Sequence, residues 1–277
     1  MAEWIVLGSG TLEQQARRGP SCHLLRDGDA TWLVDSGPGC LQRLAEAEQA
    51  PLDLAGVVHS HLHLDHLADL FPLLFHRLAA VAYGGVLPPQ PLWLSGAPGH
   101  EARLRAVAQA LYPKLLDSPL AFQEIADGTE ALLPGTAVTL RTFPADHSQS
   151  PRLLRFEGPG WSVAYTGDTG PCDGLFEAAR DVDWLVAECT SPDAVDRGKH
   201  LRPRDLADVV REARPGGLAL VHLSPLWTHP DEAAAAVRGR LQPGAATVVV
   251  GAQDGTRLEL PGGYSHSMVP GGLLEMS

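Results

Sequence analysis

Short runs of hydrophobic residues, each ended by turn-forming residues, recur along the whole chain. Runs of this length and composition predict β-strands. In the first half of the chain the predicted strands are Trp4–Leu7, Cys22–Leu25, Thr31–Val34, Gly56–Val58 and Leu92–Leu94. In the second half they are Ala137–Thr142, Leu153–Phe156, Ser162–Tyr165, Trp184–Ala187, Leu218–Val221, Thr247–Val250 and Arg257–Leu260.

Longer segments between these strands have the pattern of helices. The predicted helices are Leu41–Glu48, Leu64–His76, His100–Leu115, Pro203–Ala213 and Pro230–Leu241. Two of them begin with a proline, which the first turn of a helix tolerates because its N–H groups have no partner inside the helix. Asp205 and Asp231 follow these prolines, and acidic side chains are favoured at the positive end of the helix dipole.

The order of these elements indicates the architecture. Strands come first, strands then alternate with helices, and the second half of the chain repeats this order. Two β-sheets covered by outer helices satisfy such an order. No linker or change of composition divides the chain, so we expect residues 1–277 to form one domain, with a tail at about residues 261–277.

The composition is that of a folded globular protein. Of the 277 residues, 44 % are hydrophobic and 19 % are charged, which excludes intrinsic disorder. No hydrophobic run reaches the ~18–20 residues that span a membrane, and the N-terminal residues lack the pattern of a secretory signal. We therefore expect a cytoplasmic protein without a membrane partner.

The charge balance argues against a large nucleic-acid surface. The chain has 33 acidic and 21 basic residues and a formal net charge of −12, whereas phosphate binding needs clustered Lys and Arg. One local basic cluster consists of Arg197, Lys199, Arg202 and Arg204. It could hold an anionic substrate, or it could be a basic loop in contact with solvent.

The strongest chemical signal lies at a predicted junction between a strand and a helix. The segment reads His59-Ser60-His61-Leu62-His63-Leu64-Asp65-His66. Histidines two residues apart in an extended chain point the same way, whereas the next residues begin a helix and can turn toward a second point. Imidazole and carboxylate ligands suit zinc, and also iron or manganese. The segment therefore predicts a metal site.

This His-x-His-x-Asp-His pattern resembles that of the metallo-β-lactamase superfamily. His147 stands where the family has its third histidine, Asp168 matches its metal-bridging carboxylate, and His222 matches its last histidine. Each signal alone is weak, but all three occur in family order, each after a predicted strand, over nearly the whole chain. The resemblance implies an α/β fold, a four-layer αββα sandwich in which helices flank two mixed β-sheets.

The resemblance also implies two divalent metal ions, which we expect to be zinc, with manganese or iron as alternatives. The ligands of the first ion would be His61, His63 and His147. Those of the second would be Asp65, His66 and His222, and Asp168 would bridge the two ions. Two such ions lower the pKa of a shared water and stabilise both oxygens of a phosphoryl displacement.

Further segments resemble the branch of tRNase Z and small phosphodiesterases. Residues 7–11 and 33–39 match its N-terminal segments. Asp35 is expected to hydrogen-bond near residues 59–66, which we call the metal loop, or to cap a turn. Glu188 and His200 match a pair that assists phosphodiester cleavage, with His200 donating to the phosphate or leaving group. Small hydroxylic residues usually follow this histidine, but here the chain continues with Leu201.

The segment between His147 and Asp168 bears on the substrate. Asp168 follows His147 by only 21 positions, which leaves no room for the tRNA-gripping arm that tRNase Z enzymes commonly carry there. We therefore expect hydrolysis of small or cyclic phosphodiesters by a metal-bridged hydroxide, with Asp65, His200 and Glu188 as catalytic residues. RNA is a less favoured substrate.

Three alternatives stay open. The first is a tRNase Z-like endoribonuclease without the arm, and the second is a hydrolase of C–O or C–N bonds, as in lactonases and β-lactamases. The third is a metal-binding or scaffold protein without catalysis, which the complete set of seven ligands disfavours. The resemblance further implies a homodimer.

Overall fold

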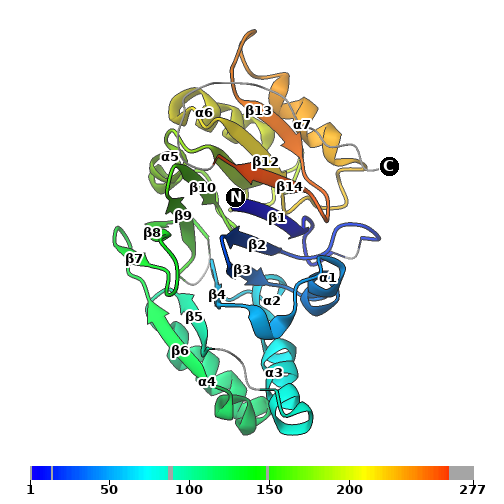
Figure 1. Ribbon diagram of the computed structural model, residues 1–277. Helices are drawn as coiled ribbons and strands as arrows, with labels where there is room; N and C mark the ends of the chain where they lie inside the picture. Colours follow the sequence, from blue (N-terminus) through cyan, green and yellow to red (C-terminus); the bar gives the residue numbers. More distant parts are fainter. Residues whose placement is uncertain (1, 14, 87–89, 148–149, 262–277) are drawn as a thin grey trace.

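The computed structural model describes residues 2–13, 15–86, 90–147 and 150–261, and this part of the chain forms two β-sheets of seven strands each (Figure 1). The first sheet has the order β14 (Arg257–Leu260), β1 (Ala2–Gly8), β2 (Cys22–Asp27), β3 (Ala30–Ser36), β4 (Gly56–Val58), β5 (Leu92–Gly96) and β6 (Leu120–Glu124). The second has the order β13 (Val248–Gly251), β12 (Gly217–Val221), β11 (Trp184–Glu188), β10 (Trp161–Tyr165), β9 (Arg152–Gly158), β8 (Thr139–Pro144) and β7 (Glu130–Leu132).

Helices cover the outer face of each sheet. The helices on the first sheet are α1 (Cys40–Glu46), α2 (Leu64–Leu67), α3 (Leu70–Gly84) and α4 (His100–Leu111), with the 3₁₀ turns η1 (Pro51–Asp53) and η2 (Pro113–Asp117). Those on the second sheet are α5 (Asp173–Ala179), α6 (Pro203–Ala213) and α7 (Pro230–Arg238). The arrangement confirms the predicted four-layer αββα sandwich with mixed sheets.

Three hydrophobic cores lie between these layers, and single strands contribute to two of them. In β12, Ala219 and Val221 belong to the core between the sheets, whereas Leu218 and Leu220 pack under α5–α7. Because successive side chains of a strand point to opposite faces, a strand that is buried on both faces must be hydrophobic at nearly every position. This requirement explains the short, continuous hydrophobic runs of the sequence.

The parallel parts of the sheets determine where the site lies. Strands β3–β6 are parallel to one another, as are β10–β13. Their carboxyl ends therefore meet at one edge of each sheet, which is where α/β proteins place binding and catalytic residues.

Two predicted helices differ most from the structure, and α1 and α7 also end two and three residues earlier than predicted. The segment from Leu64 to His76 is broken between α2 and α3, where the N–H of Asp69 donates to the carbonyl oxygen of Ser36 at 2.9 Å instead of continuing the helix. The helix predicted over His100–Leu115 ends at Leu111, because Pro113 disfavours helical backbone at the residue before it. The short elements β6, β7 and α5 are absent from the sequence prediction.

Most of the predicted tail lies outside the described residues, and the single domain over residues 1–277 stays a prediction. Among the helices that the structure describes, none combines the length and hydrophobicity needed to cross a membrane.

Candidate metal centre and cleft

All but one of the candidate ligands lie at the carboxyl ends of parallel strands in the two sheets. His61, His63, Asp65 and His66 follow β4 in the first sheet. From the second sheet, Asp168 follows β10 and His222 follows β12, whereas His147 follows the antiparallel strand β8. The inter-sheet packing brings these strand ends together, although the residues are up to 161 positions apart in the sequence.

The first group consists of His61, His63, His147 and Asp168. One nitrogen of each histidine and one oxygen of Asp168 lie within 4.8 Å of one another. The Nε2 atom of His147 is 3.3 Å from Nδ1 of His63 and 3.7 Å from Oδ2 of Asp168. These are the residues that the sequence assigns to one metal ion.

The second group consists of Asp65, His66, His222 and again Asp168, with the same mutual spacing of donor atoms. The Nε2 atom of His222 is 3.4 Å from Oδ2 of Asp65 and 3.4 Å from Oδ1 of Asp168. The Nε2 atom of His66 is 3.2 Å from the same Oδ1 atom. The two groups are therefore joined by one carboxylate.

Each oxygen of Asp168 faces a different group. Oδ2 faces His61 at 3.9 Å and His147, whereas Oδ1 faces His66 and His222. A carboxylate that offers one oxygen to each of two clusters is the arrangement expected of a bridging ligand. The His and Asp groups are consistent with a dinuclear metal site.

Several buried polar atoms in these groups support that interpretation. Within the described part of the chain, Nε2 of His61, Nε2 of His66 and Oδ1 of Asp168 are buried and have no hydrogen-bond partner. Leaving a buried polar atom without a partner costs about 1–3 kcal/mol. All three atoms point into the two groups, so divalent ions bound there would satisfy them.

Asp35 supports the metal loop from β3. Its Oδ1 atom accepts a hydrogen bond from the backbone N–H of Ser60 at 2.8 Å. Its Oδ2 atom lies 2.6 Å from Nδ1 of His66 and accepts from the hydroxyl of Tyr165 at 2.9 Å. The predicted hydrogen bonding of Asp35 near the metal loop is confirmed, and it leaves Nε2 of His66 for a metal ion.

Backbone strain occurs at two positions of the site. Asp35 has a φ of 57° and His222 a φ of 52°, in the left-handed region that costs a residue with a Cβ atom about 1–2 kcal/mol. Such strain persists where the surrounding structure over-determines the backbone, and it concentrates at functional sites. Asp35 is the last residue but one of β3, and His222 directly follows β12, so both lie at strand ends beside the site.

Burial and neighbouring carboxylates shift the pKa values of the candidate ligand histidines in opposite directions. Burial lowers the pKa of His61 to about 3 and also lowers the pKa of His63. Burial acts in the same direction on His66, but the negative charges of Asp168 and Asp35 outweigh it and raise its pKa. Neutral imidazoles are the form that binds a metal ion.

The predicted pair of Glu188 and His200 lies next to the second group. The Nδ1 atom of His200 is 3.0 Å from Oε1 of the fully buried Glu188. The ring of His200 stacks on that of His222 with centroids 5.6 Å apart and lies 5.0 Å from that of His147. The structure thus places both predicted members of the pair beside the metal groups.

Thr190 connects this pair to His222. Its hydroxyl donates to Oε2 of Glu188 at 2.5 Å and lies 2.9 Å from Nδ1 of His222. A hydroxyl has one proton, so once it donates to the carboxylate it accepts from the Nδ1–H of His222. This contact directs Nε2 of His222 toward Asp65 and Asp168.

A cleft of about 340 Å³ opens over these groups. It is lined by the candidate ligands His63, Asp65, His147, Asp168 and His222. The other lining residues are Thr11, Leu12 and Glu13 near the N-terminus and Thr190, Arg197 and His200 in the second half of the chain. This volume lies within the range of clefts that bind small-molecule ligands.

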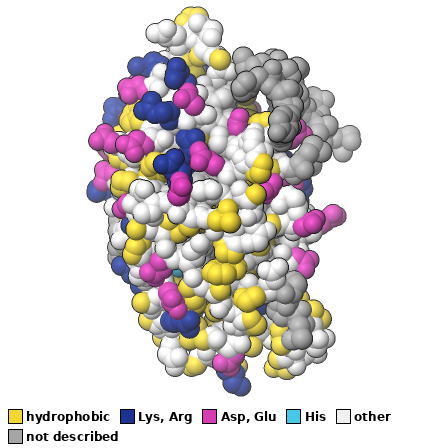
Figure 2. All heavy atoms as spheres, turned by 60° about the vertical axis from the view of Figure 1, so that its left-hand side comes forward, with side chains coloured by type: hydrophobic (Ala, Val, Ile, Leu, Met, Phe, Trp, Pro, Cys, Tyr) yellow, Lys and Arg dark blue, Asp and Glu magenta, His cyan; other side chains and the backbone are white. Residues whose placement is uncertain are grey.

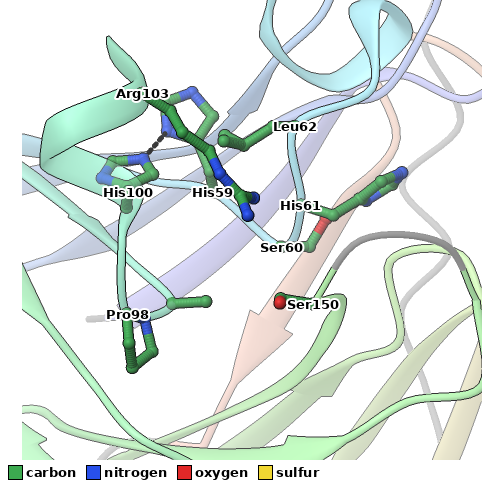
Figure 3. A pocket seen from close by; sticks show the side chains of 9 residues that line it. His59, Ser60, His61, Leu62, Pro98, His100, Arg103 and Ser150 are labelled. Atoms are coloured by element: carbon green, nitrogen blue, oxygen red, sulfur yellow. Dashed lines mark hydrogen bonds between the residues drawn. The ribbon is translucent and has the colours of Figure 1, made fainter. Parts of the chain in front are cut away.

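A second, smaller pocket lies behind the metal loop (Figure 3). His59 bonds there to His100, with Nδ1 and Nε2 3.0 Å apart, and to the hydroxyl of Ser36. Burial lowers the pKa of His59 to about 4 and that of His100 to about 2. Figure 3 shows the side chain of His61 turned away from this pocket, so His59 and His100 support the loop from behind.

Sequence reasoning missed several residues of the site. Thr190 stands two positions after Glu188, and Tyr165 stands three before Asp168, so each adjoins a motif that the sequence does reveal. Thr11 ends the segment 7–11 that resembles the tRNase Z branch, whereas Leu12 and Glu13 carry no such signal, because they reach the cleft only through tertiary packing.

The chain belongs to the metallo-β-lactamase superfamily: residues 31–223 match the model of the beta-lactamase superfamily domain. With its two-sheet fold and its His and Asp site, it is a metal-dependent hydrolase of this superfamily, similar to ribonuclease Z.

The chain is similar to several individual proteins of known name or structure. The chain is 32 % identical to ribonuclease Z of Mycobacterium bovis over 249 residues, which cover 81 % of this chain and 87 % of that one. It shares its fold with the metallo-β-lactamase fold protein YhfI of Bacillus subtilis (TM-score 0.78, 22 % identity, 93 % of this chain and 98 % of that one). A diphosphatase of the PhnP family also has this fold (TM-score 0.69, 17 % identity, 94 % and 98 %).

Proposed function

We propose that this protein hydrolyses phosphodiester bonds in small or cyclic substrates. The observation that carries the proposal is the Glu188–His200 pair, whose imidazole lines the cleft beside the candidate metal ligands. An acid at this position serves a reaction in which an alkoxide or phenoxide leaves phosphorus. The similarity to a ribonuclease Z, an enzyme named for cleaving a phosphodiester polymer, supports the same bond type.

The proposed ligand sets follow the two groups of the cleft. His61, His63 and His147 would hold one ion, Asp65, His66 and His222 would hold the other, and Asp168 would be a ligand shared by both. We propose zinc, which suits imidazole and carboxylate donors, with manganese and iron as alternatives. When bound, the ions supply activation of water and stabilisation of negative charge on the phosphoryl oxygens.

His200 is the proposed donor of the proton that the leaving oxygen needs. Burial alone lowers the pKa of His200, but the hydrogen bond and charge of Glu188 outweigh it and raise the pKa to about 9. His200 is thus an acid at neutral pH, with Nδ1 held by Glu188. We propose that Asp65 orients the attacking water. As the new P–O bond forms and the old one breaks, the leaving oxygen keeps the electron pair and takes a proton from His200.

The test combines metal content with turnover of bis(p-nitrophenyl) phosphate. About two ions per chain and activity that disappears on chelation and returns with metal would support the proposal. Asp168→Ala should lose bound metal and activity together, whereas His200→Ala should keep the metal and lose most of the rate toward a diester with an alkoxide leaving group, which needs the proton of His200. Two bound ions without diesterase activity would contradict the proposed reaction and direct the search to esters, lactones and β-lactams.

Processing of precursor tRNA is a second candidate, favoured by the 32 % identity to a ribonuclease Z. Against it, β9 and β10 are joined by a two-residue turn, so no arm emerges between them. On the face shown in Figure 2, basic and acidic side chains are interspersed and form no continuous basic stripe. Cleavage after the discriminator base of a precursor tRNA would establish this function, and intact precursor at high enzyme concentration would exclude it.

The homodimer implied by the family resemblance remains a prediction. Exposed hydrophobic side chains at the outer helices offer a surface for it: Phe75 of α3 and Leu111 of α4 are 51 % and 63 % exposed, and Phe75 contacts the ring of Tyr112. Light scattering of the purified protein, compared with Leu111→Glu, would test it. The cytoplasmic location likewise stays a prediction.

A further inference from the structure

One ion pair joins two residues that line the cleft. Nη1 of Arg197 is 2.7 Å from Oε2 of Glu13, and Nη2 is 3.4 Å from Oε1. Both residues line the cleft, although they are 184 positions apart in the sequence. The guanidinium group therefore already holds a carboxylate with the two-pronged geometry that it also uses for phosphate.

The segment of Glu13 is tied to the end of β12, and Arg197 lies close to His200 in the sequence. The N–H of Leu223, next to His222, donates to the carbonyl oxygen of Ser9 at 2.9 Å, and the amide of Gln15 donates to the carbonyl oxygen of Leu223 at 2.8 Å. Arg197 precedes His200 by three residues. The ion pair is thereby held at a defined place relative to the proposed metal centre.

Arg197 differs from the other members of the basic cluster. Lys199 binds Asp146 at 2.6 Å, and Arg202 and Arg204 face Asp205 at 3.6 and 3.7 Å. Among the described residues that line the cleft, Arg197 is the only Lys or Arg. The cluster that the sequence singles out thus contributes a single cation to the cleft.

The ion pair is weak enough to be exchanged. The side chains of Arg197 and Glu13 are 33 % and 46 % exposed, and exposed ion pairs contribute little to stability because water competes for both charges. A phosphate group bound to Arg197 replaces one charge-assisted, two-pronged contact by another. Glu13 then competes with the ligand for the same guanidinium and repels negative charge near it.

We propose that Arg197 binds a second anionic group of the substrate, apart from the scissile phosphate, and that Glu13 limits its affinity. This inference rests on the proposed phosphodiesterase function, in which the metal centre and His200 serve the scissile phosphate. It narrows the substrate to phosphodiesters that carry a further phosphate or carboxylate. Arg197 determines specificity in this scheme and takes no part in the chemical step.

The experiment compares two pairs of probes. The substrates are thymidine 5′-(p-nitrophenyl phosphate) and the same compound with a 3′-phosphate, and the product-like ligands for calorimetry are thymidine 5′-phosphate and thymidine 3′,5′-bisphosphate. The metal-loaded full chain should prefer the member with the second phosphate, with a lower KM and a lower Kd. Arg197→Ala should reduce this preference about tenfold, which corresponds to about 1.4 kcal/mol, and leave kcat for the 3′-phosphorylated substrate nearly unchanged.

Two further variants sharpen the result. Glu13→Gln should increase the preference for the second phosphate, because it frees Arg197 and removes a negative charge. Arg204→Ala, a neighbouring cation that does not line the cleft, should leave the preference as it is. Glu13→Gln is expected to increase the preference for the second phosphate. The inference can therefore be tested even if Arg197→Ala fails to fold.

The outcomes separate the two proposals. An equal preference in the unsubstituted protein and in Arg197→Ala, or no gain in Glu13→Gln, overturns the role of Arg197. Binding of the bisphosphate that depends on Arg197, without turnover of either substrate, supports the second anion site and overturns the phosphodiesterase function alone.

Discussion

The Nδ1 atom of His66 lies 2.6 Å from Oδ2 of Asp35, and both side chains are completely buried. The same carboxylate accepts hydrogen bonds from Ser60 and Tyr165, so one residue of the first sheet connects the metal loop with a strand of the second sheet. A carboxylate behind a ligating histidine sets its tautomer and orientation and raises its basicity.

Replacement of Asp35 should therefore weaken metal binding more than it disturbs the fold. Asp35→Asn keeps the shape of the side chain but removes its charge, and we expect metal affinity to fall by about 10–100-fold. Competition with a chelator of known affinity measures the change. Asp29→Asn, in the exposed turn between β2 and β3, is the control; equal affinities in the two variants would show that Asp35 has only a packing role.

Thr190 allows a sharper test of histidine orientation. Thr190→Val keeps the volume but removes the hydroxyl that lies between Glu188 and Nδ1 of His222. We expect about a 10–100-fold loss of metal affinity or activity, and Thr190→Ser should restore most of it. If valine and serine variants behave alike, the hydroxyl does not orient His222.

The Glu188–His200 pair predicts a pH dependence. Because Glu188 raises the pKa of His200 to about 9, the acid form persists at neutral pH, and kcat should fall as the pH rises through that value. Glu188→Gln removes the charge that raises the pKa, so the fall should move to lower pH. The pH profiles of the two proteins with a poor leaving group measure the shift; coinciding alkaline limbs would argue against His200 as the acid.

The metal loop packs so closely against Gly37 that this position has no room for a side chain. A Cβ atom at this position would lie 2.1 Å from the backbone oxygen of Asp65, which cannot give way without moving the loop. We expect Gly37→Ala to reduce the free energy of unfolding by about 1–3 kcal/mol and to lower metal content. Gly84→Ala, whose Cβ would meet nothing nearer than 3.7 Å, should be neutral; urea denaturation of both variants provides the comparison.

The sequence by itself determined the elements that depend on local pattern. Strands such as Gly56–Val58 and Arg257–Leu260 and the helix Pro203–Ala213 agree with the structure to the residue, because hydrophobic runs and helix-start signals are local. The candidate ligands could also be found in the sequence, because each follows a strand and belongs to a short motif. The break between α2 and α3 could not, because it depends on a contact between Asp69 and a strand remote in the sequence.

The tertiary structure alone decided how the motifs meet. Only the packing of two sheets shows that the two oxygens of Asp168 face different groups of histidines. It also shows that all four basic residues near His200 face acidic neighbours, and that Arg197, paired with Glu13, is the one of the four that lines the cleft. The contacts of Asp168 with His61 and of Arg197 with Glu13 join residues more than a hundred positions apart, and no local pattern encodes the direction in which such side chains finally point.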